Sequence, residues 1–153
     1  MITFKNVEDK DQQFIEMVYR STREKELSLT NWPEDQKHRF IIMQSIAQLA
    51  EYKKNYKDAV YKIIRYKNKS AGRLYLWESN REIRIIDISL LPEFQGKGIG
   101  GKVLSDIIKS AKQQNKIVSL TVFHDNPVKK LYERLGFKKI SHNNNREYME
   151  CKP

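Results

Sequence analysis

The residues of this chain with the clearest chemical potential form a glycine-rich loop between an apolar segment and an amphipathic one. The apolar stretch 86–91 predicts a β-strand, and the spacing of apolar residues after Gly98 predicts a helix. The loop contains Gly96, Gly98, Gly100 and Gly101. Because the first N–H groups of a helix lack partners and the helix dipole favours negative charge, this order predicts a site for a phosphate group.

Two nucleotide-binding motifs match part of this loop, and each lacks a residue that its chemistry needs. Gly96, Gly98 and Gly101 have the spacing of the dinucleotide fingerprint, which also needs an acidic residue about 20 positions later to bind a ribose. The strand predicted at 117–122 has no acidic residue at its end, and Asp125 comes late. A dinucleotide is therefore disfavoured.

The second motif is the P-loop, whose first part matches the stretch from Gly96 to Lys102. A P-loop continues with a serine or threonine that binds Mg²⁺, and Val103 stands at that position. The phosphate compound is therefore predicted to be something other than a nucleotide held by either motif.

Composition favours one soluble domain in a reducing compartment. The chain has 153 residues, of which 39% are hydrophobic and 31% charged, and no apolar stretch approaches the roughly 20 residues that span a bilayer. The N-terminus has no signal-peptide pattern. Cys151 is the only cysteine, and the three histidines show no metal spacing, so we expect no disulfide, no metal and a cytoplasmic location.

The formal net charge of +10 attracts anionic partners. Nucleic acid is the usual partner of a basic protein, but the lysines and arginines here are scattered along the chain and form no long run. The pattern favours a solvated surface first, an anionic small molecule second and nucleic acid last.

Periodicity predicts a mixed α/β order of elements. Helices are expected from Asp9 or Asp11 to about Leu29, and from Pro33 to about Lys54 with an apolar stripe at Phe40, Met43, Ala47 and Ala50. Further helices are expected after the glycine loop and at 127–135. Strands are expected at 2–7, 59–66, 72–77, 82–91, 117–122, 137–140 and 147–151. The strand–helix–strand connection predicts that 117–122 lies parallel to 82–91.

Two ordered blocks identify a family resemblance. The first is Gln95-x-x-Gly98-x-Gly100 at the start of a helix, and the second runs from Asn126 through Tyr132 to Phe137. Together they resemble the acetyl-CoA motif and the following block of the GCN5-related N-acetyltransferase (GNAT) superfamily. The resemblance implies a GNAT fold: an α/β domain with a mostly antiparallel central sheet, one parallel and splayed strand pair, and flanking helices, over residues 1–153 as a single domain.

The resemblance also implies that acetyl-CoA is the cosubstrate. By resemblance the pantetheine arm and the thioester carbonyl meet the backbone of the strand before the loop, while the pyrophosphate lies on the glycines. The residues implied to bind the cosubstrate are Leu90, Leu91, Gln95, Gly96, Lys97, Gly98, Ile99, Gly100, Gly101, Lys102, Asn126 and Tyr132.

Catalytic roles follow from the same resemblance. Tyr132 stands where the family often places a general acid, which would protonate the departing thiolate. Glu82 matches the position of the catalytic glutamate in the histone-directed branch and is the candidate base. Asp87, in the middle of an apolar strand, and a chain of water molecules are the other routes for the proton.

The implied activity is transfer of an acetyl group from acetyl-CoA to a primary amine in a ternary complex, without a metal. The candidate acceptor-binding residues are Arg23, Glu26, Trp32 and Tyr52. The alternative is a non-catalytic acyl-CoA-binding or nucleic-acid-binding module on the same fold. Family members are often dimers, so a homodimer is a further expectation, and no membrane partner is expected.

Overall fold

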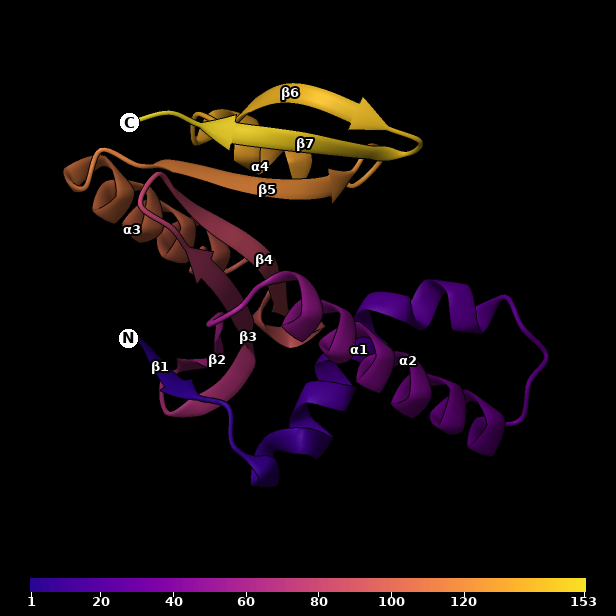
Figure 1. Ribbon diagram of the computed structural model, residues 1–153. Coiled ribbons are helices and arrows are strands. Elements are labelled where there is room, and N and C mark those ends of the chain that lie inside the picture. Colours follow the sequence, from indigo (N-terminus) through magenta and orange to yellow (C-terminus); the bar gives the residue numbers. More distant parts are fainter.

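A single seven-stranded mixed sheet runs through the molecule, and helices cover both of its faces (Figure 1). The computed structural model describes residues 1–153. The strand order is β1-β2-β3-β4-β5-β7-β6. The strands are β1 (Ile2–Asn6), β2 (Val60–Tyr66), β3 (Lys69–Glu78), β4 (Glu82–Leu90), β5 (Ile117–Phe123), β6 (Lys138–Asn143) and β7 (Arg146–Cys151). The helices are α1 (Gln12–Ser28), α2 (Glu34–Asn55), α3 (Ile99–Gln113) and α4 (Lys129–Arg134), and 3-10 turns lie at Asp9–Asp11 and Pro92–Phe94.

The predicted fold class is confirmed, including the parallel neighbour of β4. β4 and β5 form the only parallel pair, and every other pairing is antiparallel. Local pattern did not predict that β7 inserts between β5 and β6. The last hairpin reaches β5 with its second strand, so the segment that follows α4 lies at the edge of the sheet.

The parallel pair is short, and the two strands then separate. Hydrogen-bonded register joins Glu82–Arg84 of β4 to residues 117–119 of β5, although both strands continue beyond this segment. The register of β4 against β3 shifts at the same place, because Tyr75 faces Asp87 while the next residue of β3 faces Ile85. Ile86 is the extra residue of this β-bulge, which bends a strand and increases its twist. The bulge turns the last residues of β4 away from β5.

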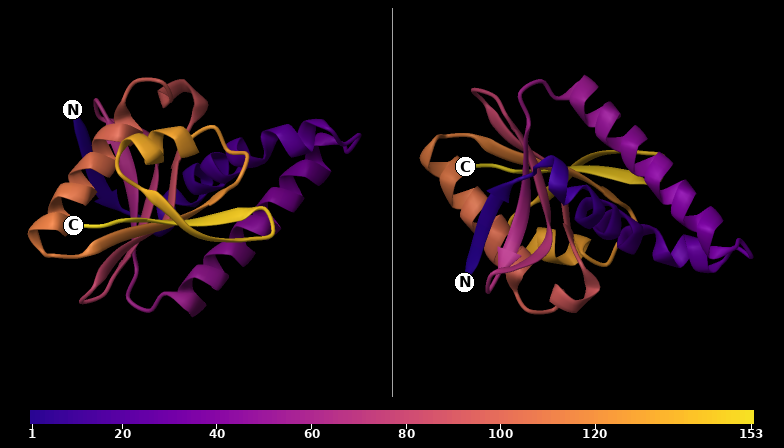
Figure 2. Two further views of the ribbon diagram at one scale, coloured as in Figure 1. Left: turned by 90° about the horizontal axis from the view of Figure 1, so that it is seen from above. Right: turned by 90° about the horizontal axis from the view of Figure 1, so that it is seen from below.

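Two apolar clusters hold these elements together. The larger cluster joins α3 and α4 to the sheet, and α3 supplies Ile99, Val103, Leu104 and Ala111 to it, as the helical spacing predicted. The smaller cluster joins α1 to α2 through Tyr19, Leu27 and Ile41. The views in Figure 2 place α3 and the α1–α2 pair on opposite faces of the sheet. No helix is both long and apolar enough to cross a bilayer.

The predicted apolar stripe of α2 is wrong. Met43 is 61% exposed, and Ala47 and Ala50 are also exposed. The buried residues of α2 are Ile41 and Ser45, one turn apart, and the same stripe continues to Gln48 and Tyr52. The inner face of this helix therefore becomes polar toward its end, where it meets charged groups of the sheet, and a purely apolar pattern selects the wrong face.

Candidate active site

The glycine loop has the backbone conformation that an anion site requires. Gly96 has φ of 73° and Gly98 has φ of 80°, in the left-handed region that favours glycine. Gly98 is the N-cap of α3, and no side chain caps this end of the helix. The first N–H groups of α3, from Ile99 to Gly101, are therefore open to a ligand. Lys97 is exposed beside them, and Lys102 forms an ion pair with Asp106 at 3.1 Å.

Gln95 ties this loop to the end of β4. Its side-chain amide donates a hydrogen bond to the carbonyl oxygen of Leu90 at 2.9 Å. The N–H of Leu91 donates to the carbonyl oxygen of Ala71 at 2.9 Å, so it belongs to the β3 side of the strand. Because successive N–H groups point to opposite edges of a strand, those of Leu90 and Ile88 point toward β5, where β4 has no partner. The family resemblance implied a role for Leu90 and gave no role to Ile88.

Tyr132 of α4 belongs to the larger apolar cluster, together with residues of β4 and β5. Its side chain is 7% exposed and its ring packs against Phe137, with 5.8 Å between ring centroids. Burial, and then the negative charge of Asp87, raise the pKa of Tyr132 to about 12. The hydroxyl has no hydrogen-bond partner in the chain, yet it is not among the enclosed unpartnered polar atoms, which belong to Arg65 and Arg84. The Tyr132 hydroxyl is therefore protonated at neutral pH and open to a ligand.

Glu147 on β7 fixes the segment that carries Tyr132. It is 2% exposed, accepts a hydrogen bond from Lys129 Nζ at 2.6 Å, and lies 2.7 Å from Nδ1 of His124. Lys129 is the first residue of α4, and His124 follows β5. Asn126 closes the turn that leads into the same helix, because its Oδ1 accepts the N–H of Val128, the N-cap residue, at 3.0 Å. The Asn126 side chain thus has a structural role besides the predicted contact with the cosubstrate.

The contacts of Glu147 with Lys129 and His124 predict that the free energy of unfolding decreases at acid pH. The hydrogen bond from Lys129 holds the pKa of Glu147 below its ordinary value. A carboxyl group with a lowered pKa stabilises the fold above its unfolded pKa, about 4.3, and loses this contribution as the pH falls. We expect Glu147→Gln to be less stable than the wild type at pH 7, and the difference to shrink at pH 3. Urea unfolding of both proteins at the two pH values measures this, with exposed Glu133→Gln as the control. A pH-independent difference would contradict it.

The two carboxylates proposed for proton removal lie on one face of β4 in different surroundings. Glu82 lies in the segment paired with β5, where its carboxylate accepts the Ser119 hydroxyl at 2.7 Å. Asp87 lies beyond the bulge, beside the separated part of the strands. Its side chain forms a 2.8 Å ion pair with Arg73, which is 2% exposed.

Asp87 and Arg73 are the centre of a buried polar network. Asp87 also accepts the hydroxyl of Ser89 at 2.7 Å and that of Tyr52 at 3.1 Å, while Arg73 donates to Gln48 at 2.8 Å. Burial and the charge of Asp87 raise the pKa of the Tyr52 hydroxyl. Of the predicted acceptor residues, Tyr52 is therefore the one that the structure joins to β4. Arg73 was not predicted, because its partner is distant in the sequence.

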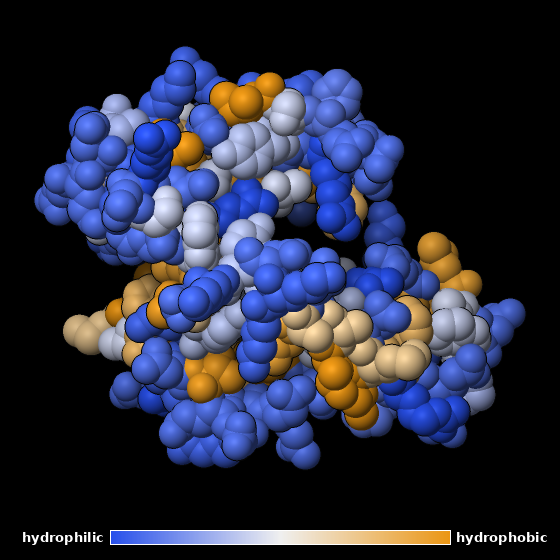
Figure 3. All heavy atoms as spheres, viewed as in Figure 1, coloured by the Kyte–Doolittle hydropathy of each residue, from blue (hydrophilic) through white to orange (hydrophobic).

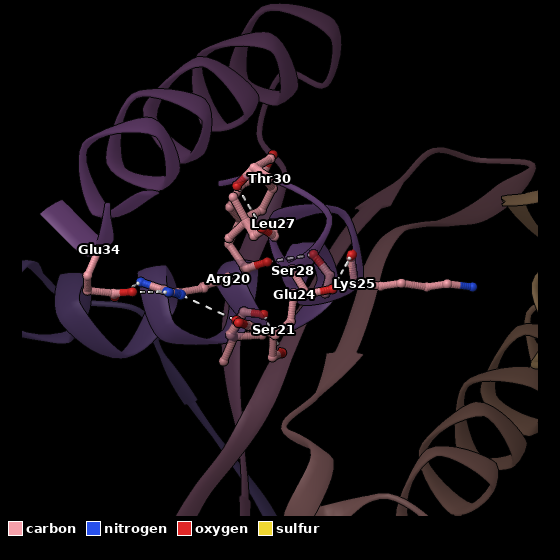
Figure 4. Close-up of polar contacts among 11 residues, drawn as sticks. Arg20, Ser21, Glu24, Lys25, Leu27, Ser28, Thr30 and Glu34 are labelled. Carbon is pink, nitrogen blue, oxygen red and sulfur yellow. Dashed lines mark hydrogen bonds and ion pairs between the residues drawn. The ribbon is translucent and has the colours of Figure 1, made fainter. Parts of the chain in front are cut away.

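The other three predicted acceptor residues gather where α1 meets α2. Arg23 forms an ion pair with Glu26 at 2.8 Å and lies 5.6 Å from the Phe40 ring, which packs edge-on against Trp32. Nearby, Arg20 joins the two helices through hydrogen bonds of 2.6 and 3.0 Å to Glu34 (Figure 4). Arg20 thus fixes the two helices to each other. Arg23, Glu26 and Trp32 form a group separate from Tyr52.

Residues 15–137 match the model of the acetyltransferase (GNAT) family. The chain belongs to the GNAT acetyltransferase family. No curated protein matches the sequence.

Solved structures agree with this assignment at the level of the fold. The PaiA N-acetyltransferase of Thermoplasma acidophilum, in complex with coenzyme A, superposes with a TM-score of 0.72 at 20% identity, over 100% of this chain and 99% of that one. PH1933 from Pyrococcus horikoshii gives 0.71 at 19%, with the same coverage. The ribosomal-protein-S18-alanine N-acetyltransferase of Escherichia coli gives 0.67 at 16%, over 99% and 94%. This GNAT protein shares their whole fold.

Proposed function

We propose that this protein transfers the acetyl group of acetyl-CoA to a primary amine, directly, in a ternary complex. The separation of β4 from β5 supports this most strongly. Beyond Arg84, the β5-facing edge of β4 has no strand partner, and it leads to the open N-terminus of α3. An extended chain with amide groups, such as pantetheine, can hydrogen-bond to such an edge as an added strand does. The pyrophosphate would then lie on the first turn of α3.

The same geometry places a hydrogen-bond donor for acyl transfer. The thioester of acetyl-CoA supplies the acetyl group, and negative charge develops on its carbonyl oxygen during attack. The N–H groups of Ile88 and Leu90 point into the gap and are the donors that can stabilise this charge, an effect of roughly 3–4 kcal/mol in other acyl-transfer sites. Tyr132, protonated at neutral pH, would donate its proton to the departing thiolate.

Proton removal from the amine is assigned to Glu82. Glu82 lies on the face of the sheet that carries Asp87 and its partner Tyr52, the acceptor face, at the closed end of the gap, so it would act through intervening water. Asp87 is a poorer base in this arrangement, because Arg73, Tyr52 and Ser89 already occupy both of its oxygens. Its role in the proposal is to hold Tyr52 at the acceptor side of the strand.

A thiol-release assay tests this function. Incubation with acetyl-CoA and a panel of amines should release free coenzyme A with at least one amine, and the product should carry one acetyl group by mass spectrometry. If calorimetry shows tight acetyl-CoA binding and no amine releases thiol, the protein is a binding module. If acetyl-CoA does not bind at millimolar concentration, both the acetyltransferase and the binding-module hypotheses fail.

A pair of variants at Gly98 tests the phosphate site itself. We expect Gly98→Asp to weaken coenzyme A binding by about 100-fold, or about 2.7 kcal/mol. The added carboxylate would lie where the backbone comes closest to the pyrophosphate and would repel it. It would also neutralise the positive end of the helix dipole, which otherwise attracts the phosphate. Gly98→Asn is the matched control, because asparagine has the same size, tolerates positive φ and carries no charge. Equal losses in both variants would show that charge at this end of α3 is irrelevant.

A further inference from the structure

A polar pocket of about 430 Å³ lies on the acceptor face of the sheet, apart from the residues assigned above. Leu120 and Met149 enter the core beneath the sheet, so their strand neighbours Thr121 and Tyr148 face the opposite way, into this pocket. The hollow between the β5–β7 half of the molecule and the helix pair α1–α2 is visible in Figure 3. The lining of the pocket comes from β5 and from the β6–β7 hairpin, and it includes Thr121, Arg146 and Tyr148.

Arg146 lines this pocket, and Arg84 contacts two of its lining residues; neither arginine has a carboxylate partner. Arg84 of β4 reaches across to β5, where its Nη2 donates to the Thr121 hydroxyl at 2.7 Å, and its guanidinium lies 5.7 Å from the centre of the Tyr148 ring. Nη1 of Arg84 is enclosed and has no hydrogen-bond partner. Arg146 lines the pocket with its guanidinium 5.0 Å from the Phe123 ring. Each guanidinium is therefore held against an aromatic ring rather than against an acid.

The acidic groups on this face do not neutralise the two arginines. Glu150 accepts the Tyr148 hydroxyl at 2.7 Å, and Glu82 accepts the Ser119 hydroxyl, whereas neither forms an ion pair with Arg84 or Arg146. A guanidinium without an acidic partner can form charge-assisted hydrogen bonds with an anion. The net charge of +10 favours the same sign of ligand.

We propose that this pocket, the arginine pocket, binds a carboxylate group carried by the amine acceptor. The inference rests on the proposed acetyltransferase function and narrows its substrate class. Arg84 is on β4, the strand that would line the thioester, so a carboxylate bound beside it would lie along the same strand as the reacting carbonyl. Acceptors are thus amino acids or peptides with an acidic group, and polyamines and aminoglycosides are repelled.

A binding experiment tests the arginine pocket without requiring turnover. The coenzyme A complex is titrated by calorimetry with glutarate and with glutaramide, which match in size and differ in charge. We expect glutarate to bind and glutaramide not to bind. Arg84→Gln and Arg146→Gln should each weaken glutarate binding about 10-fold, while Arg134→Gln, an exposed arginine on α4 beyond the other face, should leave it unchanged.

Three results of this titration would overturn the inference. They are equal binding of glutarate and glutaramide, unchanged glutarate binding in both pocket variants, and binding of inorganic phosphate at least tenfold tighter than glutarate. Because Arg146 is exposed, its variant is expected to fold even if Arg84→Gln does not.

Kinetics then separate this inference from the proposed function. We expect 4-aminobutanoate to be a better acceptor than 4-aminobutanamide and spermidine, and the two pocket variants to raise its KM about 10-fold with little change in kcat. A preference for spermidine, or pocket variants that leave the KM unchanged, would overturn the arginine pocket while the acetyltransferase stands. If no amine releases thiol, the proposed function fails, and the glutarate titration still decides whether the anion site exists.

Discussion

Replacing Arg73 by glutamine is expected to lower the free energy of unfolding by about 3–5 kcal/mol. Arg73 is 2% exposed, and its guanidinium is the only cation paired with Asp87, at 2.8 Å. Removing the cation leaves a carboxylate in the protein interior with only the hydroxyls of Tyr52 and Ser89 as donors. A loss of this size is a large share of the stability of an ordinary domain. Urea unfolding followed by circular dichroism measures it.

A double variant separates the loss of the pair from loss of packing. Arg73→Met combined with Asp87→Leu removes both charges and keeps apolar volume, so it should be more stable than either single variant. Arg39→Gln breaks an exposed ion pair with Asp35 and should cost less than about 1 kcal/mol. A small effect of Arg73→Gln, comparable with that of Arg39→Gln, would show that Asp87 is well solvated without its partner.

Replacing Tyr132 by phenylalanine is expected to reduce kcat by about 10²–10⁴-fold while changing the KM for acetyl-CoA little. The substitution keeps the ring that packs on Phe137 and removes only the hydroxyl. Because burial and the charge of Asp87 raise the pKa of Tyr132 to about 12, its proton is present throughout neutral and mildly alkaline solution. Thiol release with a reactive amine, measured between pH 7 and 10, gives the comparison.

The control for Tyr132 is a half-buried tyrosine two strands away from β4. Tyr61→Phe removes a hydroxyl on β2, where the ring packs against Tyr75, and should leave kcat unchanged. An unchanged kcat in Tyr132→Phe would remove the tyrosine from the reaction. Equal losses in both variants would indicate a general effect of hydroxyl removal on the fold.

Features that depend on neighbours in the chain were predicted from the sequence. The glycine loop, the helix after it and the following strand each follow from a run of residue types, and the structure confirms them within a few residues. The structure adds that Gly98 has a positive φ, which few residues other than glycine adopt. The parallel pairing of β4 and β5 follows from the strand–helix–strand connection between them.

Features that depend on distant partners were not predicted. The bulge at Ile86 has no local signal, because it exists only in the register of β4 against β3. Arg73 looks like a surface residue until Asp87 and Gln48 are brought beside it. The N–H of Ile88 is available only because β5 turns away, which no pattern within β4 reveals.

The position of α3 has a mechanical consequence. Although β4 and β5 stop bonding to each other after Arg84, α3 packs against both strands and so connects the two halves of the sheet. Any change in the angle between the two halves of the sheet must therefore tilt α3, whose N-terminus is the turn at Gly98. The width of the gap and the aim of the anion-binding N–H groups consequently vary as one coordinate rather than as two.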